Sequence, residues 1–401
     1  MVLILERVLP YECRTRSRRL ACVPPSSDST ARAGIRLDSL TSLRWFAAFG
    51  VFLFHLRNIV TFPGWFEWLA VDGYLGVTFF FVLSGFVLTW SWRRTTPVKA
   101  FYWRRFARIY PLHLLTLLIA IPVFYRLVVP EGQWWIKPLD AGVLFLSVLV
   151  IQGWWLAPSI LFSGNPAAWT LTVEAFFYAL HPAIVRSMLR LRARGALIGC
   201  VLVVVVAFIL RVTILVWPDS GFARIPEPVM HLPSFVLGML LAWAYRQGWR
   251  LQLPIVVPTA ALIGWLLFVA LAARAQIGLP GFFTAEVVAL LCALMIAAAA
   301  TKDTEGKRGI LTWRPLVALG EWSFAFYLIH ATLMYALMEF IGPRHGSYWQ
   351  TMLWGVILLA LAIFAAWALH HFVERPMEKR MRAWQDRRLA RRSADQPAVS
   401  R

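Results

Sequence analysis

A histidine lies deep within an apolar segment near the start of the sequence. His55 falls past the midpoint of residues 43–62, a stretch long enough to cross a bilayer. An ionisable side chain at that depth costs about 2 to 3 kcal/mol or more, so it indicates a functional site. A neutral imidazole could act there as a general base toward a hydroxyl group, or as a nucleophile that attacks a carbonyl carbon.

Arg44 precedes this histidine by eleven residues. Eleven steps of about 100° return a helix to within roughly 20° of the same face, about 16 Å along the axis. We therefore expect the guanidinium and the imidazole on one face of one helix. The alternative is an interfacial arginine and a packed histidine, with Arg57 and Asn58 near the far interface, but a charged partner inside a membrane favours a functional pair.

Three arginines precede the third apolar segment. Arg105 and Arg108, with Arg104 beside them, stand just before Ile109. Guanidinium groups one helical turn apart suit phosphate groups, which they bind through paired hydrogen bonds. An ordinary basic flank of a membrane span would explain the charge alone equally well.

Two further segments carry polar residues at helical spacing. Glu174 lies inside an apolar segment, and Tyr178 follows it one turn later. Ser323, Tyr327 and His330 fall at positions i, i+4 and i+7, so they form one polar stripe on a predicted span. Within a membrane, such a stripe favours a helix that faces a cavity, although it could also hold a bridging water or join neighbouring helices.

The composition indicates which elements position these residues. Apolar residues make up 60% of the 401 positions, 21 residues are tryptophan, and the mean hydropathy is +0.65. These values predict an all-α polytopic membrane protein and exclude a soluble globular domain. The net charge of +20 is concentrated in short segments between apolar runs, which is typical of cytoplasmic loops and lipid contact and gives no indication of nucleic-acid binding.

The chain contains eleven apolar segments, of which we expect ten to cross the membrane. The basic connections must all lie on one side, but three apolar segments separate residues 93–108 from 186–194. One of the three therefore cannot cross, and residues 139–156, which are short and flanked by charge, are predicted to be re-entrant or interfacial. Both termini are expected in the cytoplasm. The eleven segments are 43–62, 73–92, 109–129, 139–156, 171–187, 196–217, 229–245, 255–273, 283–301, 316–340 and 348–372.

The sequence divides into three parts. Residues 1–36 are basic and lack a long apolar core, so they predict a disordered cytoplasmic tail and no cleavable signal peptide. Residues 37–376 form the membrane domain, and 377–401 are expected to be a basic cytoplasmic tail. The sequence Glu374-Arg375-Pro376 is expected to end the last span, with a structural role. The four cysteines show neither a disulfide framework nor metal-ligand spacing, so no metal is expected.

Six motifs in a fixed order resemble the membrane-bound acyltransferase 3 family, whose members O-acylate bacterial surface polysaccharides and related acceptors. The resemblance covers about residues 37–376. Its motifs are Leu43-Arg44 through His55, Gly73 to Val77 with Phe79 to Phe86, Arg105 to Pro111, Trp169-Thr170-Leu171 with Glu174 and Tyr178, Ser323 to His330, and Glu374 to Pro376.

The resemblance implies catalytic roles for Arg44 and His55, and a role for Arg105 and Arg108 in binding an acyl-coenzyme A (acyl-CoA) donor. It also implies a bacterial inner-membrane location, with acyl-CoA as co-substrate and no other cofactor. Some family members carry a C-terminal hydrolase domain of the SGNH type. This chain has a short basic segment in that place, so a second transfer step is expected to need another protein.

The resulting hypothesis is a channel for the donor through the helix bundle. Arg105 and Arg108, with Arg104, would bind the CoA phosphates at the cytoplasmic end, and the acyl group would reach His55 at membrane depth. Glu174 could orient the neutral imidazole, as a carboxylate does in a catalytic triad. We expect an acetyl group, but the sequence specifies neither the acyl group nor the carbohydrate or glycolipid acceptor.

A different class of protein is compatible with the same residues. Buried His, Glu and Arg also suit a transporter or flippase for a glycolipid or small molecule. The two halves of the chain show no convincing repeat and no matching pair of broken helices, which many transporters have. The sequence therefore favours the enzyme.

Overall fold

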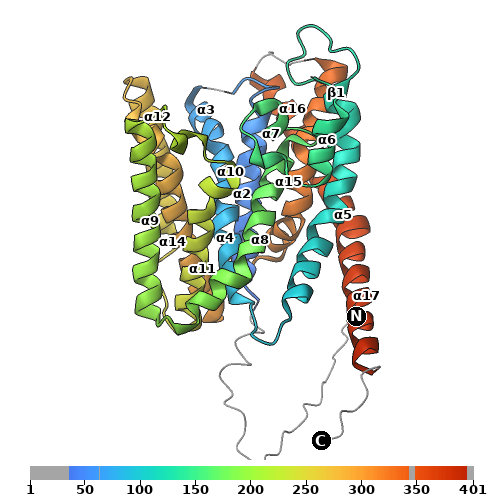
Figure 1. Cartoon of the computed structure of the whole chain (residues 1–401). Helices are drawn as coiled ribbons and strands as arrows, with labels where there is room; N and C mark the ends of the chain where they lie inside the picture. The colour runs from blue at the N-terminus through green and yellow to red at the C-terminus, as the bar shows by residue number, and fades with distance from the viewer. Residues whose placement is uncertain (1–35, 63, 343–347, 395–401) are drawn as a thin grey trace, which may run out of the picture. The chain divides into compact units, whose positions relative to one another are not determined.

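The computed structural model describes residues 36–62, 64–342 and 348–394 and shows an all-α bundle, as predicted (Figure 1). Nine helices in these residues are long and apolar enough to span a membrane. The predicted N-terminal tail lies outside the described residues, apart from Arg36. The bounds of the main helices are α2 Asp38–Leu56, α4 Gly76–Trp90, α5 Val98–Phe124, α8 Trp169–Ser187, α9 Ala193–Val216, α11 Leu232–Arg246, α12 Val256–Arg274, α14 Thr284–Thr304, α15 Arg314–Ile341, α16 Tyr348–Leu369 and α17 Arg375–Ala394.

Short elements connect these helices. They are α3 Gly64–Val71, α6 Ala141–Val148, α7 Pro158–Leu161, α10 Glu227–Met230 and α13 Leu279–Phe282, the 3₁₀ turns η2 Asp72–Leu75, η3 Gln152–Trp154, η4 Pro166–Ala168, η5 Met188–Arg190, η6 Gly221–Arg224 and η7 Ile310–Thr312, and the π-helical turn η8 His370–Glu374. Strands β1 Tyr125–Arg126 and β2 Lys137–Pro138 form a small parallel pair.

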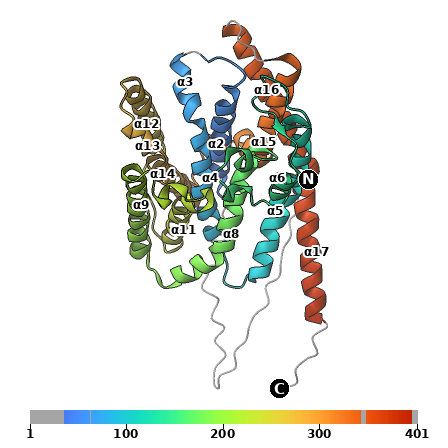
Figure 2. The same cartoon turned by 45° about the horizontal axis from the view of Figure 1, so that its top comes forward.

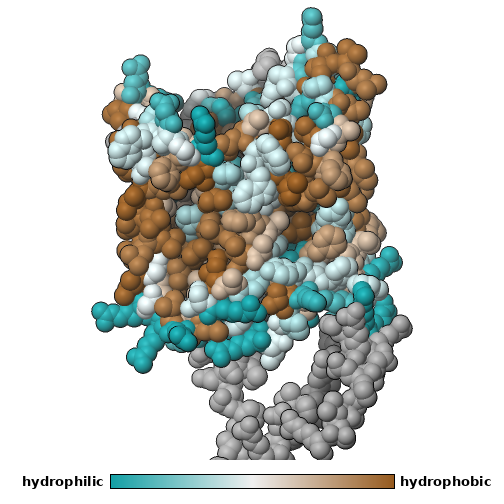
Figure 3. All heavy atoms as spheres, viewed as in Figure 1, coloured by the Kyte–Doolittle hydropathy of each residue, from teal (hydrophilic) through white to brown (hydrophobic). Residues whose placement is uncertain are grey.

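The surface of the bundle matches a bilayer. Figure 3 shows a predominantly apolar band between two hydrophilic ends. Helix α9 contributes exposed apolar side chains to the lipid-accessible surface, among them Val201, Leu202 and Ile209. A continuous apolar surface of this kind is unfavourable in water and favourable in lipid, so it supports the membrane location that the composition predicts.

The segment predicted not to cross the membrane is short and irregular. Helix α6 has eight residues, and the turns η3, α7 and η4 follow it before α8 begins. Its buried polar groups are largely hydrogen bonded: Ser147 and Ser163 join their hydroxyls at 2.6 Å, and Asn165 donates to the carbonyl of Leu328 in α15 at 2.7 Å. Internal hydrogen bonds are what non-helical backbone requires at membrane depth, so these contacts are compatible with the predicted re-entrant or interfacial segment.

Helix α8 is the tenth predicted span. It has 19 residues, as many as α2, but contains Glu174, His181 and Arg186 and is absent from the nine most apolar helices. It packs against α4 and α5 within the bundle. Protein contacts on its flanks can shelter its polar residues from lipid.

Two helix boundaries differ from the sequence prediction. Helix α5 begins at Val98, directly after Pro97, so Arg104, Arg105 and Arg108 lie on the helix rather than before it. The expected end of the last span at Pro376 is wrong, because α17 continues to Ala394. Pro376 is the second residue of α17, where a missing backbone N–H is tolerated, and the π-helical turn connects α16 to it.

The centre of the bundle contains α2, α4 and α15, with α9 and α12 on one side and α5 and α17 on the other (Figures 1 and 2). Helices α2 and α15 pack closely because Gly320 has no side chain: a Cβ there would lie 1.9 Å from the carbonyl oxygen of Thr41. Gly85 allows a similar approach of α4 to α11 at the carbonyl of Phe235.

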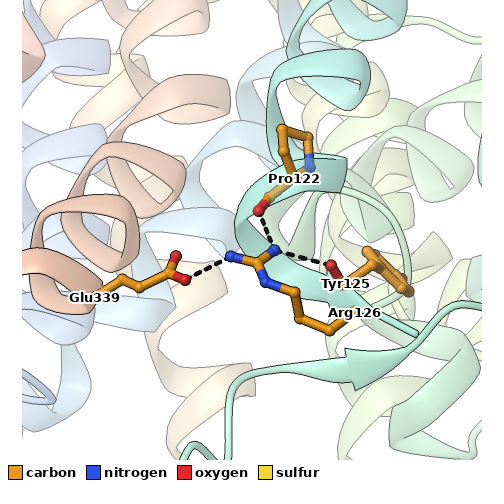
Figure 4. A network of polar contacts seen from close by, with 4 residues as sticks. All are labelled: Pro122, Tyr125, Arg126 and Glu339. Atoms are coloured by element: carbon orange, nitrogen blue, oxygen red, sulfur yellow. Dashed lines mark hydrogen bonds and ion pairs between the residues drawn. The ribbon is translucent and has the colours of Figure 1, made fainter. Parts of the chain in front are cut away.

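A polar network fixes the end of α5 that lies near β1. The Arg126 guanidinium forms an ion pair with Glu339 of α15 and donates to the carbonyl oxygens of Pro122 and Tyr125 (Figure 4). These contacts attach the loop after α5 to the last turns of α15.

Candidate active site

Five helices surround one cavity of about 360 Å³, which we call the central cavity. Helices α2, α4, α5, α8 and α15 each contribute side chains to its wall. Its volume lies within the range of small-molecule sites, and its lining combines apolar rings with a few polar groups, as such sites commonly do.

The central cavity brings together most of the residues singled out from the sequence. Its predicted lining residues are Arg44, Arg105, Arg108, Glu174, Tyr178, Ser323 and Tyr327. They come from segments separated by as much as 280 positions in the chain. The structure therefore unites residues of five of the six sequence motifs in one place.

Hydrogen bonds order the polar part of the cavity wall. Tyr178 donates to the Glu174 carboxylate at 3.0 Å. Thr170 lies 3.1 Å from the Tyr327 hydroxyl, which itself donates to the carbonyl of Ala167 at 3.1 Å. Ser323 donates to its own helix, at the carbonyl of Gly320. The Thr170 and Tyr327 pair thus joins α8 to α15.

His55 and His330 lie close together outside the set of cavity-lining residues. Their ring centroids are 5.2 Å apart, with an angle of 54° between the planes. His330 is one helical turn beyond Tyr327, and their rings are 6.0 Å apart. Since Arg44 and His55 both face α15, the arrangement agrees with the predicted common face of α2.

Glu174 is not hydrogen bonded to His55 among the described residues. Its carboxylate accepts from Tyr178 and lines the central cavity with Arg44, Arg105 and Arg108. The side chain beside the His55 imidazole is therefore another histidine, and the suggested pairing of the carboxylate with this ring gains no support from the geometry.

A second pocket, of about 210 Å³, opens next to the central cavity and shares Leu88, Ser91 and Arg105 with it. We call it the arginine pocket. Its arginines are Arg93, Arg94, Arg104, Arg105, Arg186 and Arg382, and none of the described residues that line it is Asp or Glu. Sequence reasoning found Arg104 and Arg105 but treated the other four as ordinary basic flanks, because they lie in separate connections and only the fold brings them together.

A third pocket, of about 290 Å³, carries both signs of charge. Arg44 and Arg108 line it as well as the central cavity, and Glu374 and His370 face them from the π-helical turn. The His370 imidazole is 3.0 Å from the buried Glu374 carboxylate. Glu374 therefore belongs to the surroundings of the central cavity, beyond the helix-ending role expected from the sequence.

The fold and the cavity define a polytopic membrane protein with an internal polar site. A family model described as an acyltransferase domain matches residues 37–371, and the chain belongs to this acyltransferase 3 family. It is a membrane-bound acyltransferase. This result decides between the two classes left by the sequence, in favour of the enzyme.

Relatives agree with this assignment. The chain is 36% identical to acyltransferase MdmB of Streptomyces mycarofaciens, over 85% of this chain and 92% of that protein. It is 24% identical to the O-acetyltransferase OatA of Staphylococcus aureus and 26% identical to the peptidoglycan O-acetyltransferase OatA of Listeria monocytogenes, over 86% of this chain in each case. It covers 57% and 56% of these two proteins. No solved structure matches the chain.

Proposed function

We propose that the protein is an O-acyltransferase of the bacterial cytoplasmic membrane that moves an acyl group, acetyl in the first instance, from cytoplasmic acyl-CoA to an acceptor hydroxyl. The acceptor is a cell-surface glycan or a related carbohydrate or glycolipid. The names of the two OatA relatives support O-acetyl transfer, and the Listeria relative acts on peptidoglycan according to its name. Positive-inside bias places the arginine-rich end of the bundle, and both termini, in the cytoplasm.

The arginine pocket and the central cavity fit the two ends of the donor. Six guanidinium groups, of which Arg382 also forms an ion pair with Glu378, provide a site for the CoA phosphates. Arg105 belongs to both spaces, so a molecule bound in the pocket can continue into the cavity beside this residue. Arg104 and Arg105 thus retain their predicted donor-binding role, and Arg108 contacts the donor inside the cavity.

The central cavity extends from the arginine pocket toward the histidine pair. Apolar side chains such as Val77, Phe80 and Phe81 surround much of it. Arg44 lies about 16 Å below His55 by the helical rise, so it contacts the arm of the donor and leaves the thioester to the histidine. Tyr327 lines the cavity one turn before His330 and marks its upper end.

His55 performs the chemistry as a general base. Its free ring nitrogen removes the proton of the acceptor hydroxyl while the oxygen attacks the thioester carbonyl carbon. The new C–O bond forms, the C–S bond breaks, and the proton passes from the imidazole to the departing CoA sulfur. The products are the O-acyl ester and free CoA, and the enzyme is unchanged.

One observation carries the proposal. Arg44, Arg105, Arg108, Glu174 and Tyr327 line one cavity that leads from an arginine-rich pocket toward the His55 and His330 pair. An anionic thioester donor needs cations at one end and a base at the other. The cavity wall supplies the cations, and the pair of His55 and His330 lies next to the lining residue Tyr327 in the same bundle.

The test is release of free CoA from acetyl-CoA by purified protein in lipid nanodiscs, with and without a crude envelope glycan fraction. We expect release that requires both the glycan and His55, so His55→Ala abolishes it. His371→Ala is the matched control, since this histidine lies in the π-helical turn and contacts the Trp367 carbonyl. Stoichiometric release without acceptor would indicate an acyl-imidazole intermediate, and no release with several acyl-CoA donors would overturn the proposal.

A further inference from the structure

Backbone hydrogen bonds fix the ring of His330. Its Nδ1 lies 2.8 Å from the carbonyl oxygen of Tyr327 and 3.1 Å from that of Phe326. Because a carbonyl oxygen can only accept, Nδ1 must carry the hydrogen. The other nitrogen of the neutral ring, Nε2, is then an acceptor with an available lone pair.

The two neighbouring imidazoles each contain a buried nitrogen without a partner. These atoms are Nε2 of His330 and Nδ1 of His55, and neither has a hydrogen bond in the part of the chain that the structure describes. Native proteins rarely leave buried polar atoms unpaired, so such atoms need an explanation. With the ring centroids 5.2 Å apart, each histidine is the nearest suitable partner for the other.

Aromatic rings enclose the pair and hold it in place. Phe326 stacks on His330 with an interplanar angle of 12°, and Phe52 contacts the same imidazole. Phe54 packs edge-on against His55 at 5.2 Å. These apolar neighbours offer the free nitrogens no competing hydrogen bond.

We propose that His330 is a positioning residue for acyl transfer: its Nε2 accepts a hydrogen bond from Nδ1–H of His55 and so directs the bare Nε2 of His55 toward the reacting groups. This inference rests on the function proposed above. Centroids 5.2 Å apart allow two imidazole rings to bring one nitrogen of each into hydrogen-bond range, and catalytic hydrogen bonds commonly shorten and align when the substrate binds.

The hydrogen bond also has a role during the reaction. When His55 takes the acceptor proton on Nε2, its ring becomes an imidazolium, and Nδ1–H donates more strongly to the lone pair of His330. The proton on Nε2 then passes to the CoA sulfur, and His55 returns to its starting tautomer. The hydrogen on Nδ1 stays in place throughout, so His330 orients the base without exchanging a proton.

This role corresponds to that of the carboxylate in a Ser-His-Asp triad, which holds the tautomer of the catalytic histidine. Glu174 does not occupy the equivalent position, since its carboxylate accepts from Tyr178 in the central cavity. A neutral imidazole avoids placing a second charge among Phe52, Phe54 and Phe326, where burial would be costly.

Two conservative substitutions separate the proposed role from simple packing. The side-chain amide of Gln reaches the place of His Nε2, whereas that of Asn reaches only the place of Nδ1. We therefore expect His330→Gln to retain kcat within about tenfold, and His330→Asn to lower it by about 10² or more, with an unchanged KM for acetyl-CoA. Equal kcat values for the two variants, or a change confined to KM, would overturn the proposal.

Controls separate loss of folding from loss of orientation. The thermal midpoints of both variants in nanodiscs should match each other, and His371→Gln and His371→Asn should leave kcat unchanged. A second measurement uses the wild-type protein alone: ¹⁵N NMR of histidine-labelled protein, assigned with His55→Gln, should show neutral His55 with hydrogen on Nδ1. Hydrogen on Nε2 would contradict the proposal.

The two proposals fail in different ways. If wild-type protein does not cleave the thioester, the proposed function is wrong, and the NMR tautomer still tests the histidine contact. If wild-type protein is active but the Gln and Asn variants are indistinguishable, only the positioning role of His330 is wrong.

Discussion

Arg44 and Arg108 come from different helices, α2 and α5, yet both line the same two spaces, the central cavity and the pocket that contains Glu374. They separate the central cavity, where we propose that the donor binds, from a pocket lined by three glutamates. Two neighbouring cations repel each other, so nearby anions are needed to stabilise them. Glu174 lines the central cavity and Glu374 lines the other pocket, so a carboxylate lies on each side of the two arginines. The arrangement keeps two cations at the cavity wall.

The first prediction concerns the arginine pocket. We expect Arg186→Ala and Arg382→Ala each to raise the KM for acetyl-CoA by about tenfold, because each variant loses a charge-assisted contact to phosphate. The kcat should change little. Steady-state kinetics with acetyl-pantetheine, which lacks the phosphates, should show no difference from wild type.

Arg190→Ala is the matched control for this prediction, since Arg190 is exposed in the turn after α8 and does not line the pocket. An unchanged KM for acetyl-CoA in both pocket variants would place the donor phosphates elsewhere.

The second prediction concerns Glu174. Substitution by Gln keeps an acceptor for Tyr178 but removes the negative charge that faces Arg44, Arg105 and Arg108. We expect kcat to fall by about tenfold or more, since unbalanced cations in a cavity poor in water bind the donor in other positions. Acceptor-dependent CoA release measures this, and undiminished turnover would exclude a role for the carboxylate.

The third prediction concerns the contact between α2 and α15. We expect Gly320→Ala to lower stability by about 1 to 3 kcal/mol or more, because the added Cβ would collide with the Thr41 carbonyl. The displaced helices would also separate the two histidines, so activity should fall with stability. Gly264→Ala in α12 is the control, because nothing lies within 4 Å of that position. Thermal midpoints measured in nanodiscs test this. If Gly320→Ala and Gly264→Ala have the same midpoint, the close contact between Gly320 and Thr41 is contradicted.

The fourth prediction concerns Lys137, in the loop outside the membrane spans. Burial lowers the pKa of its amine from 10.5 to about 8, and the amine donates to the Phe162 carbonyl at 2.6 Å. Reductive methylation, followed by mass spectrometry of the Lys137 peptide, should therefore reach half its maximal rate near pH 8. A midpoint above about pH 10 would contradict a buried amine.

This pKa has a consequence for stability with a defined sign. Between about pH 8 and pH 10.5 the folded protein has a neutral Lys137, whereas the unfolded chain still binds the proton. The free energy of unfolding should therefore rise with pH across this window, and Lys137→Met should remove that contribution.

Helical periodicity was sufficient to predict part of the site. The common face of Arg44 and His55 follows from their spacing alone, and both residues face α15 in the structure. The apolar runs, the re-entrant segment and the polar stripe of Ser323 and Tyr327 were also predictable, because lipid exposure leaves a strong signal in composition.

The partners of each side chain were not predictable in the same way. His330 meets His55 because Gly320 and Thr41 set the approach of two helices separated by more than 250 residues. Likewise, Arg186 and Arg382 join Arg105 only when α8, α17 and α5 pack together. In the sequence, these arginines look the same as any basic loop residue.

Helix α17 continues beyond the segment that defines the family. The family match ends at residue 371, inside the π-helical turn, but Glu374 and Arg382 still line pockets, and Trp103 of α5 donates to the carbonyl of Met381. A chimera that exchanged family domains at residue 371 would therefore combine the proposed donor site of one protein with the helix α17 of another. To transfer donor preference intact, the junction must lie after the last contact of α17 with α5.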